Sequence, residues 1–254
     1  MSTALAPAAT DTAAVALRHV TKTHGPTTQD HGVRALDDVS LEVPRGTFLA
    51  VMGPSGSGKS TLLHCAAGLD TPTSGDVVLA GTEIGRLDET RRTELRRDRI
   101  GFVFQAYNLL PALTVADNIT LPLRLAGRPL DADWVQHLVE RVVLTGRLGH
   151  RPAELSGGQQ QRAAIARALV ARPAVVFADE PTGALDLHSA AEVLDLLREL
   201  VDELGQTVVM VTHDPAAAAR AHRAVVMADG RVVATLERPT AADLAARLVA
   251  LREG

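Results

Sequence analysis

The sequence has little cysteine, little lysine and no long apolar run. Cys65 is the only cysteine among 254 residues, which excludes an internal disulfide and a cysteine-based metal cluster and fits a reducing cytosol. We expect Cys65 to be a small packing residue. No stretch reaches about 18 uninterrupted apolar residues, so we expect no segment to span a bilayer, and any membrane role needs a partner.

A strong excess of charge is also lacking. With 26 Lys and Arg against 30 Asp and Glu, the net charge is -4, which gives no electrostatic reason to expect a nucleic-acid partner. Lys22 and Lys59 are the only lysines, so a lysine kept at position 59 is worth examining. Residues 1–14 have neither a basic n-region nor a continuous apolar h-region, which predicts a flexible N-terminal tail and no signal peptide.

Short apolar runs alternate with helical patterns along most of the chain. Residues 33–43 alternate between apolar and polar, as in a strand with one wet face, and predict an antiparallel lobe. Residues 48–52 form a continuous apolar run that ends at a glycine turn, and residues 62–67 beyond it predict a buried helix. The same unit recurs with apolar runs at 174–178 and 207–211.

This alternation predicts an α/β fold with a mainly parallel sheet covered on both faces, which binds ligands at the carboxyl ends of its strands. Between residues 106 and 155 the strand signal disappears, which predicts an inserted α-helical subdomain with Trp134 in its core. Ala-Asp-Gly at 228–230 predicts a hairpin, and Thr240 with Asp243 resembles a capping box that opens a C-terminal helix over 240–254.

A glycine-rich segment follows the first fully apolar run. It reads GPSGSGKST and matches the G-x-x-x-x-G-K-[ST] phosphate loop, with a strand before it and a helix after it. Glycines let backbone N–H groups wrap phosphates, and the helix N-terminus adds positive partial charge. We expect Lys59 to bind the β- and γ-phosphates and Ser60 to give its hydroxyl to Mg²⁺. The predicted nucleotide-binding residues are Gly53, Pro54, Ser55, Gly56, Ser57, Gly58, Lys59, Ser60 and Thr61.

An acidic pair follows the apolar run at 174–178. We expect Asp179 to hold Mg²⁺, usually through water, and Glu180 to orient and polarise the attacking water as a general base. An Asp-Glu pair alone is usually a solvated strand end. The apolar run before it and the phosphate loop favour the catalytic interpretation, so the two motifs together predict a nucleoside triphosphatase.

The segment LSGGQQQR at residues 155–162 resembles the signature motif of the ATP-binding cassette (ABC) family. A serine and two glycines at a helix N-terminus form an anion site that nothing in this subunit fills. A simple helix cap by Ser156 does not explain the glycine pair. The resemblance extends over about residues 15–236 and implies an ABC ATPase domain at 15–239, with a P-loop NTPase (RecA-like) parallel-sheet core. It also implies that the γ-phosphate of ATP held by another subunit is contacted by Ser156, Gly157, Gly158 and Gln159.

Three further motifs follow in family order. Gln105 ends the apolar run at 100–104 and matches the Q-loop glutamine, which touches Mg²⁺ and the attacking water and senses the permease. Residues 181–186 resemble the D-loop, which crosses the dimer interface and would bring Asp186 to the nucleotide. His213 matches the switch histidine that contacts the γ-phosphate. The resemblance therefore implies Gln105, Glu180 and His213 as catalytic residues, and as Mg²⁺ ligands Ser60, Gln105 and Asp179.

Two segments suggest a subfamily. The sequences TGALD at 182–186 and FQAYNLLP at 104–111, with extra residues at 27–32, are similar to the ATPases paired with FtsX/MacB-type permeases, including LolD and FtsE. This resemblance implies a homodimer that binds two ATP molecules and works on the cytoplasmic face of the membrane through an integral permease. The cargo stays open among lipoprotein release, efflux and cell-wall hydrolase control.

Two other functions compete with this interpretation. One is a soluble ABC ATPase, such as an iron-sulfur assembly ATPase. The other is a regulatory ATP-binding module without turnover, which conflicts with the presence of both Glu180 and His213.

One position departs from the family pattern, and it generates a prediction. His24 falls where relatives generally carry an aromatic that stacks on adenine. Histidine stacks less strongly, so this position does not exclude GTP as a substrate. The alternative is that His24 is a solvated loop residue and adenine lies elsewhere. Base stacking is worth about 1–3 kcal/mol and imidazole lies at the low end, so His24→Ala should raise the dissociation constant of ATP by about tenfold or less. An unchanged constant in an equilibrium titration supports the solvated loop.

Overall fold

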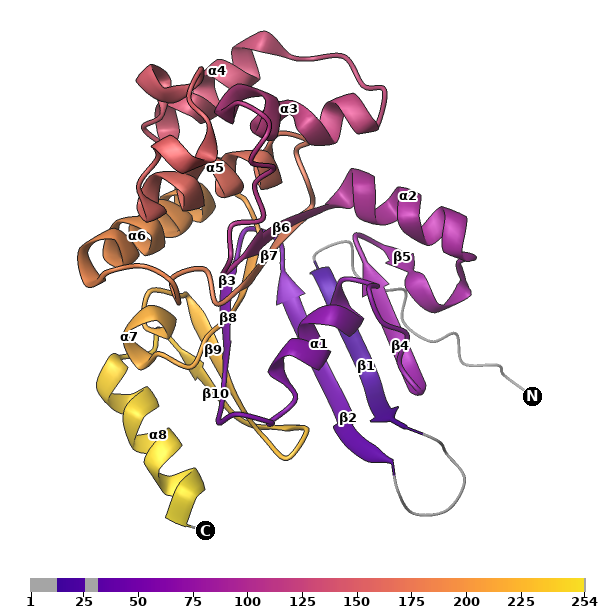
Figure 1. The fold of residues 1–254 in the computed structure, drawn as a ribbon. Coiled ribbons are helices and arrows are strands. Elements are labelled where there is room, and N and C mark those ends of the chain that lie inside the picture. The colour runs from indigo at the N-terminus through magenta and orange to yellow at the C-terminus, as the bar shows by residue number, and fades with distance from the viewer. Residues whose placement is uncertain (1–12, 26–31, 254) are drawn as a thin grey trace.

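The computed structural model describes residues 13–25 and 32–253 (Figure 1). The predicted tail over residues 1–14 lies outside the described residues except for Ala13 and Ala14, which begin the first strand. Of the extra residues at 27–32, only Gly32 is described.

A six-stranded sheet forms the centre of the fold. Its strand order is β10-β9-β3-β8-β7-β6, with β9, β3, β8, β7 and β6 parallel and β10 antiparallel at one edge. The inner strands are continuous apolar runs because both faces of the sheet are covered. The strands are β3 (Phe48–Met52), β6 (Ile100–Phe104), β7 (Val175–Asp179), β8 (Val208–Val211), β9 (Arg223–Ala228) and β10 (Arg231–Glu237).

A second, antiparallel sheet makes the predicted lobe, in the order β2-β1-β4-β5. From Val39 to Pro44 in β2, buried and exposed residues alternate strictly, which is the pattern of one face packed and one face wet. The strands are β1 (Ala13–His24), β2 (Val33–Pro44), β4 (Ser74–Leu79) and β5 (Thr82–Glu83).

Side chains of the central strands point alternately into two cores. Ala50 of β3 packs into one core together with α5 (Gly157–Leu169) and α6 (Leu187–Leu204). Val51 packs into the other core, which α1 (Lys59–Ala66) shares with the antiparallel lobe. Helices α1 and α5 therefore cover opposite faces of the sheet.

Cys65 is buried in the α1 core. Burial raises the pKa of its thiol to about 11, so the thiol stays protonated, as a packing residue should.

The segment between residues 106 and 155 holds helices and loops and no strand, as predicted. Trp134 is partly buried there against the α5 core, and the guanidinium of Arg172 lies 4.7 Å from its ring centroid. The helices of this segment are α3 (Val115–Leu125), α4 (Ala132–Arg141), η2 (Thr145–Arg147) and η3 (Pro152–Glu154).

The remaining helices lie at the margins of the two sheets. The predicted hairpin at 228–230 joins β9 to β10, and a final helix follows it. Within residues 13–25 and 32–253, no helix has the length and apolar character needed to cross a membrane. The helices are η1 (Ile84–Arg86), α2 (Glu89–Arg99), α7 (Pro215–Ala218) and α8 (Ala241–Glu253).

Helix α5 packs closely on the sheet at Gly101 in β6, and this contact can be tested. A Cβ there would lie 2.4 Å from the carbonyl oxygen of Ala168. Gly101→Ala should lower the free energy of unfolding by about 1–3 kcal/mol in urea titrations, because backbone must shift to admit the methyl group. Gly146→Ala is the matched control, since a Cβ at Gly146 meets nothing within 4 Å. Equal stability of the two variants would contradict the close contact.

Candidate active site

The predicted catalytic segments leave the sheet at the carboxyl ends of neighbouring strands. Asp179 at the end of β7 pairs with Phe104 of β6 on one side and with Val211 of β8 on the other. Gln105 directly follows β6, and His213 lies two residues after the end of β8. The phosphate loop follows β3, which is the neighbour of β8 in the sheet. Parallel strand ends meet at one edge, so the sheet brings these segments together.

The phosphate loop owes its shape to backbone that packs directly on backbone. Gly53 has φ 156°, and a Cβ there would lie 2.2 Å from the carbonyl oxygen of Met227. Gly58 has φ 97°, and a Cβ there would lie 2.2 Å from the carbonyl oxygen of Ala35. Glycine is required at both positions because these gaps exclude any side chain.

Lys59 is folded back into this loop. Its Nζ atom donates to the carbonyl oxygens of Gly53 at 3.0 Å and Pro54 at 2.8 Å. Burial lowers the pKa of the Lys59 ammonium, and the carboxylates of Glu180 and Asp179 partly oppose that shift. A desolvated cation held among loop carbonyls is suited to an anionic ligand such as a phosphate.

The start of α1 differs from the other α-helices of the described chain. Only the backbone of Gly58 caps α1, whereas a side-chain oxygen accepts from the first turn of every other one. The first N–H groups of α1 therefore have no partner within the helix or its cap. Ser57 adds a buried hydroxyl oxygen with no hydrogen-bond partner. These orphan groups fit a phosphate. The capping residues elsewhere are Asp88, Thr114, Asp131, Ser156, Asp186, Asp214 and Thr240.

The acidic pair forms the opposite wall. Burial raises the pKa of Asp179, the charge of Glu180 adds to the rise, and His64 and Lys59 oppose it. A half-buried carboxylate at a strand end, with a second carboxylate on the next residue, fits a divalent cation. The sequence interpretation missed His64, although it lies in the helix that follows the phosphate loop. That position is the only signal for it in the sequence.

Glu180 is held in an uncommon backbone conformation, with φ 45°. Its N–H donates to the carbonyl oxygen of Val211 at 2.9 Å, and its own carbonyl oxygen accepts from Gly183 at 3.0 Å. The carboxylate then meets His213, whose Nδ1 atom lies 2.9 Å from Glu180 Oε1. The His213 side chain is 69% exposed and that of Glu180 28%, so the pair faces the solvent where a ligand enters.

Gln105 lies against the turn that follows Glu180. A Cβ on Gly183 would come within 2.8 Å of Gln105 Nε2, so the glutamine side chain covers that glycine. Ser60 is exposed in the first turn of α1. The three predicted Mg²⁺ ligands thus come from the first turn of α1 (Ser60), the residue after β6 (Gln105) and the end of β7 (Asp179).

The other predicted nucleotide contacts lie apart from the phosphate loop. Ser156 caps α5, accepting from Gln159 N at 3.3 Å while its own N–H donates to Gln159 Oε1 at 3.1 Å. The hydroxyl proton of Ser156 stays available for an anion. Asp186 caps α6 and accepts from His188 N and Ser189 N, each at 3.0 Å, so its carboxylate is engaged inside the subunit. Nucleotide contact by these residues stays a prediction.

His24 is the last residue of β1 and is exposed. It pairs with Val33 of β2, two residues before Ala35, which touches the phosphate loop at Gly58. The strand pairing therefore places His24 at the same end of β2 as Ala35, and contact of His24 with adenine stays a prediction.

The sequence over residues 36–183 matches the family described as ABC transporter. This chain belongs to the ABC transporter family. It is 52% identical over 80% of its length to the macrolide export ATP-binding/permease protein MacB 1/2 of Paracoccus denitrificans, of which it spans only 30%. It is 47% identical over 79% of its length to the lipoprotein-releasing system ATP-binding protein LolD of Shewanella oneidensis, of which it spans 88%.

A solved structure carries the same fold. The ATP-binding cassette MJ0796, in a dimeric post-hydrolysis state bound to ADP and Pi, superimposes with a TM-score of 0.78 at 40% identity, over 88% of this chain and 98% of that one. The predicted fold class and the predicted family are confirmed. The chain therefore carries an ABC ATPase domain.

Glu180 offers the most direct test of the hydrolytic site. Glu180→Gln keeps the shape and loses the base, so ATP should still bind while steady-state hydrolysis falls by about a hundredfold or more. ATP should then trap a dimer, visible by size-exclusion chromatography. Glu199→Gln, which replaces a surface glutamate of α6, serves as the control. Near-normal turnover by the Glu180 variant would reject its assignment as the base.

Proposed function

We propose that this ABC ATPase binds MgATP between two copies of itself and uses hydrolysis to drive a separate membrane permease. The observation that supports this most is that the predicted phosphate-binding groups are divided between two faces of the central sheet. The loop with Lys59 meets Glu180 and His213 at one edge of the sheet, whereas Ser156 begins a helix on the opposite face.

Binding of the triphosphate is assigned to the phosphate loop. Lys59 exchanges its loop carbonyls for the β- and γ-phosphates, and this relieves the desolvation of its ammonium. The N–H groups of Lys59, Ser60 and Thr61 bind phosphate oxygens at the helix N-terminus. His24 covers the base.

The ligands of the metal are assigned to Ser60, Gln105 and Asp179. Mg²⁺, when bound, would neutralise charge on the β- and γ-phosphates. The raised pKa of Asp179 fits this role, because the carboxylate gains a cation that the subunit alone does not supply.

Glu180 and His213 are assigned to the hydrolytic step. Glu180 accepts a proton from the attacking water, and its position is set by the Val211 carbonyl and by His213. His213 donates to the γ-phosphate from the nitrogen that does not face Glu180. Gln105 orients the water from the neighbouring strand end.

The second half of each site is assigned to the partner copy. The Ser156 hydroxyl and the N–H groups of Gly157 and Gly158 form an anion site remote from the loop of their own subunit. Head-to-tail pairing of two copies brings each of these onto the loop of the other. The dimeric state of MJ0796 supports this arrangement.

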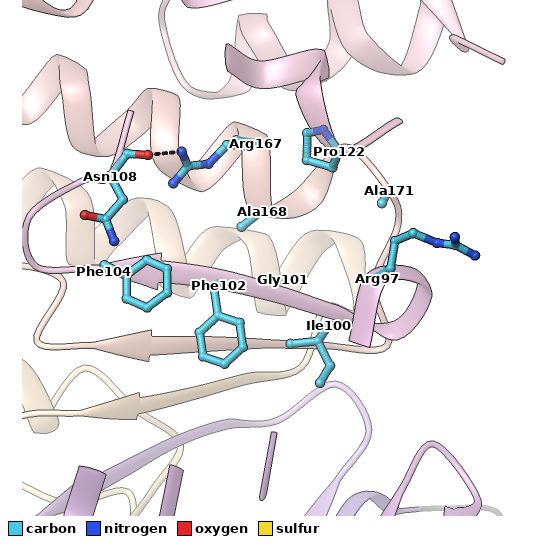
Figure 2. A pocket seen from close by; sticks show the side chains of 10 residues that line it. All are labelled: Arg97, Ile100, Gly101, Phe102, Phe104, Asn108, Pro122, Arg167, Ala168 and Ala171. Carbon is cyan, nitrogen blue, oxygen red and sulfur yellow. Dashed lines mark hydrogen bonds between the residues drawn. The ribbon is translucent and has the colours of Figure 1, made fainter. Parts of the chain in front are cut away.

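A permease contact is assigned to a cavity of about 300 Å³ beside the Q-loop (Figure 2). Its floor is the stacked pair Phe102 and Phe104, with ring centroids 5.3 Å apart, and Arg97 and Arg167 line its sides. A helix of an integral permease that presents apolar and acidic side chains fits this lining. The subunit would then lie on the cytoplasmic face of the membrane, as part of a LolD- or MacB-like system.

Mixing two inactive variants tests the shared site. One copy carries Lys59→Ala and the other Ser156→Arg, so each homodimer lacks one half of both sites. In the mixed dimer both defects fall in one site, and the other site is intact. Random pairing makes about half the dimers mixed, so the mixture should recover up to about a quarter of wild-type ATPase activity.

The controls separate a shared site from coupling between sites. Each variant alone should stay inactive at the same total concentration. A closed mixed dimer without hydrolysis indicates that both sites must fire together. Absence of both rescue and an ATP-dependent mixed dimer would contradict the shared-site arrangement.

A further inference from the structure

The loop that carries Gln105 rests on the helix that carries the signature motif. After β6 ends at Phe104, the chain leaves the sheet through residues 105–108 and passes along α5. Three side-chain contacts join this loop to α5. Gln161 and Arg167 make two of them and lie outside the predicted site, whereas the third reaches Gly157 of the signature motif.

The first contact holds the start of the loop. Gln161 is fully buried, and its Nε2 atom lies 3.4 Å from the carbonyl oxygen of Phe104, directly before Gln105. The Oε1 atom of Gln161 is buried without a hydrogen-bond partner. Burying the amide oxygen without a partner costs free energy, and the hydrogen bond from Nε2 to the Phe104 carbonyl offsets part of that cost.

The second contact holds the end of the loop. Arg167 donates from Nη2 to the carbonyl oxygen of Tyr107 at 2.8 Å and from Nη1 to the carbonyl oxygen of Asn108. Figure 2 shows its guanidinium turned toward Asn108 above the cavity. Burial lowers the pKa of Arg167, and no carboxylate within the described ranges forms an ion pair with it. The two loop carbonyls are therefore its recorded partners.

Those two carbonyls belong to strained backbone. Tyr107 and Asn108 have φ 59° and φ 51°, in the left-handed region that residues other than glycine adopt infrequently, tyrosine less readily than asparagine. Two such residues in succession persist only where the surroundings hold them. The fork of Arg167 supplies that hold, because it binds both carbonyls at once.

The third contact reaches the signature motif. A Cβ on Gly157 would lie 2.8 Å from the hydroxyl of Tyr107, so the ring covers the first residue of α5. Tyr107 is the only tyrosine of the chain, and burial raises the pKa of its hydroxyl. The loop thus touches both ends of α5.

We propose that Arg167 is a positioning residue that clamps residues 105–108 onto α5. The clamp fixes the position of Gln105 relative to Ser156, the serine of the signature motif. Arg167 lies outside the predicted catalytic and nucleotide-binding residues and acts through the loop carbonyls. The inference rests on the proposed function only for its kinetic readout.

Arg167→Met tests the clamp, since it keeps the length of the side chain and removes both hydrogen bonds. We expect kcat for ATP hydrolysis to fall by about 10- to 100-fold with KM for ATP changed by less than about twofold, because the phosphate loop is untouched. Arg167→Lys, which reaches one carbonyl instead of two, should lie between the variant and the wild type.

Arg172→Met is the matched control. Arg172 follows the same helix and ties it to Asp131 at 2.8 Å and to Trp134, but it makes no hydrogen bond to the loop. Its kcat should stay near wild type. Thermal unfolding of all three variants reports any general loss of stability. An Arg167→Met kcat equal to that of Arg172→Met would overturn the proposal.

A second readout does not depend on activity. Fluorotyrosine incorporated at the sole tyrosine gives one fluorine resonance for Tyr107. Arg167→Met should move that resonance toward its position in the unfolded protein, and Arg172→Met should leave it in place. An unmoved resonance in Arg167→Met shows that the loop holds without Arg167 and overturns the clamp. If the wild type hydrolyses no ATP, the proposed function fails while the resonance still decides the clamp.

Discussion

The ammonium of Lys59 is buried against two loop carbonyls. The arrangement of the active site around it depends on compensating for the water that this charge has lost. A desolvated cation is tolerated only where anions or carbonyl dipoles surround it. The glycines at 53 and 58 let those dipoles approach, because they permit backbone of the loop to lie directly on backbone from β9 and β2. The antiparallel lobe thereby becomes part of the phosphate site.

The carboxylate of Asp179 has lost water in the same way as the Lys59 ammonium, and it carries the opposite charge. Asp179 ends a strand whose residues are otherwise apolar, so its carboxylate is partly desolvated and its pKa rises. Lys59 and Asp179 each lessen the other's cost, but neither is neutralised in the subunit alone. A site with unmet charge of both signs suits a ligand that carries both, such as a triphosphate with its magnesium ion.

Helix α5 joins the site to the rest of the molecule. Its first turn presents Ser156, its buried face packs on the sheet, and Gln161 and Arg167 bind the backbone of the Q-loop. Small residues make this possible, since Gly101 and Ala168 let the helix approach β6 so closely that its arginine reaches the loop. A displacement of the Q-loop would therefore move α5, and with it the signature motif, through these hydrogen bonds and not through the nucleotide.

The sequence by itself determined the strand-loop-helix order, the parallel core and the identity of the phosphate loop, because those features depend on local periodicity and on glycine spacing. It also placed Asp179, Glu180, Gln105 and His213 at strand ends. Tertiary structure alone decided the partners of these groups. The pairing of Glu180 with His213 and the clamp on Tyr107 join residues far apart in the chain, through hydrogen bonds that no local pattern records.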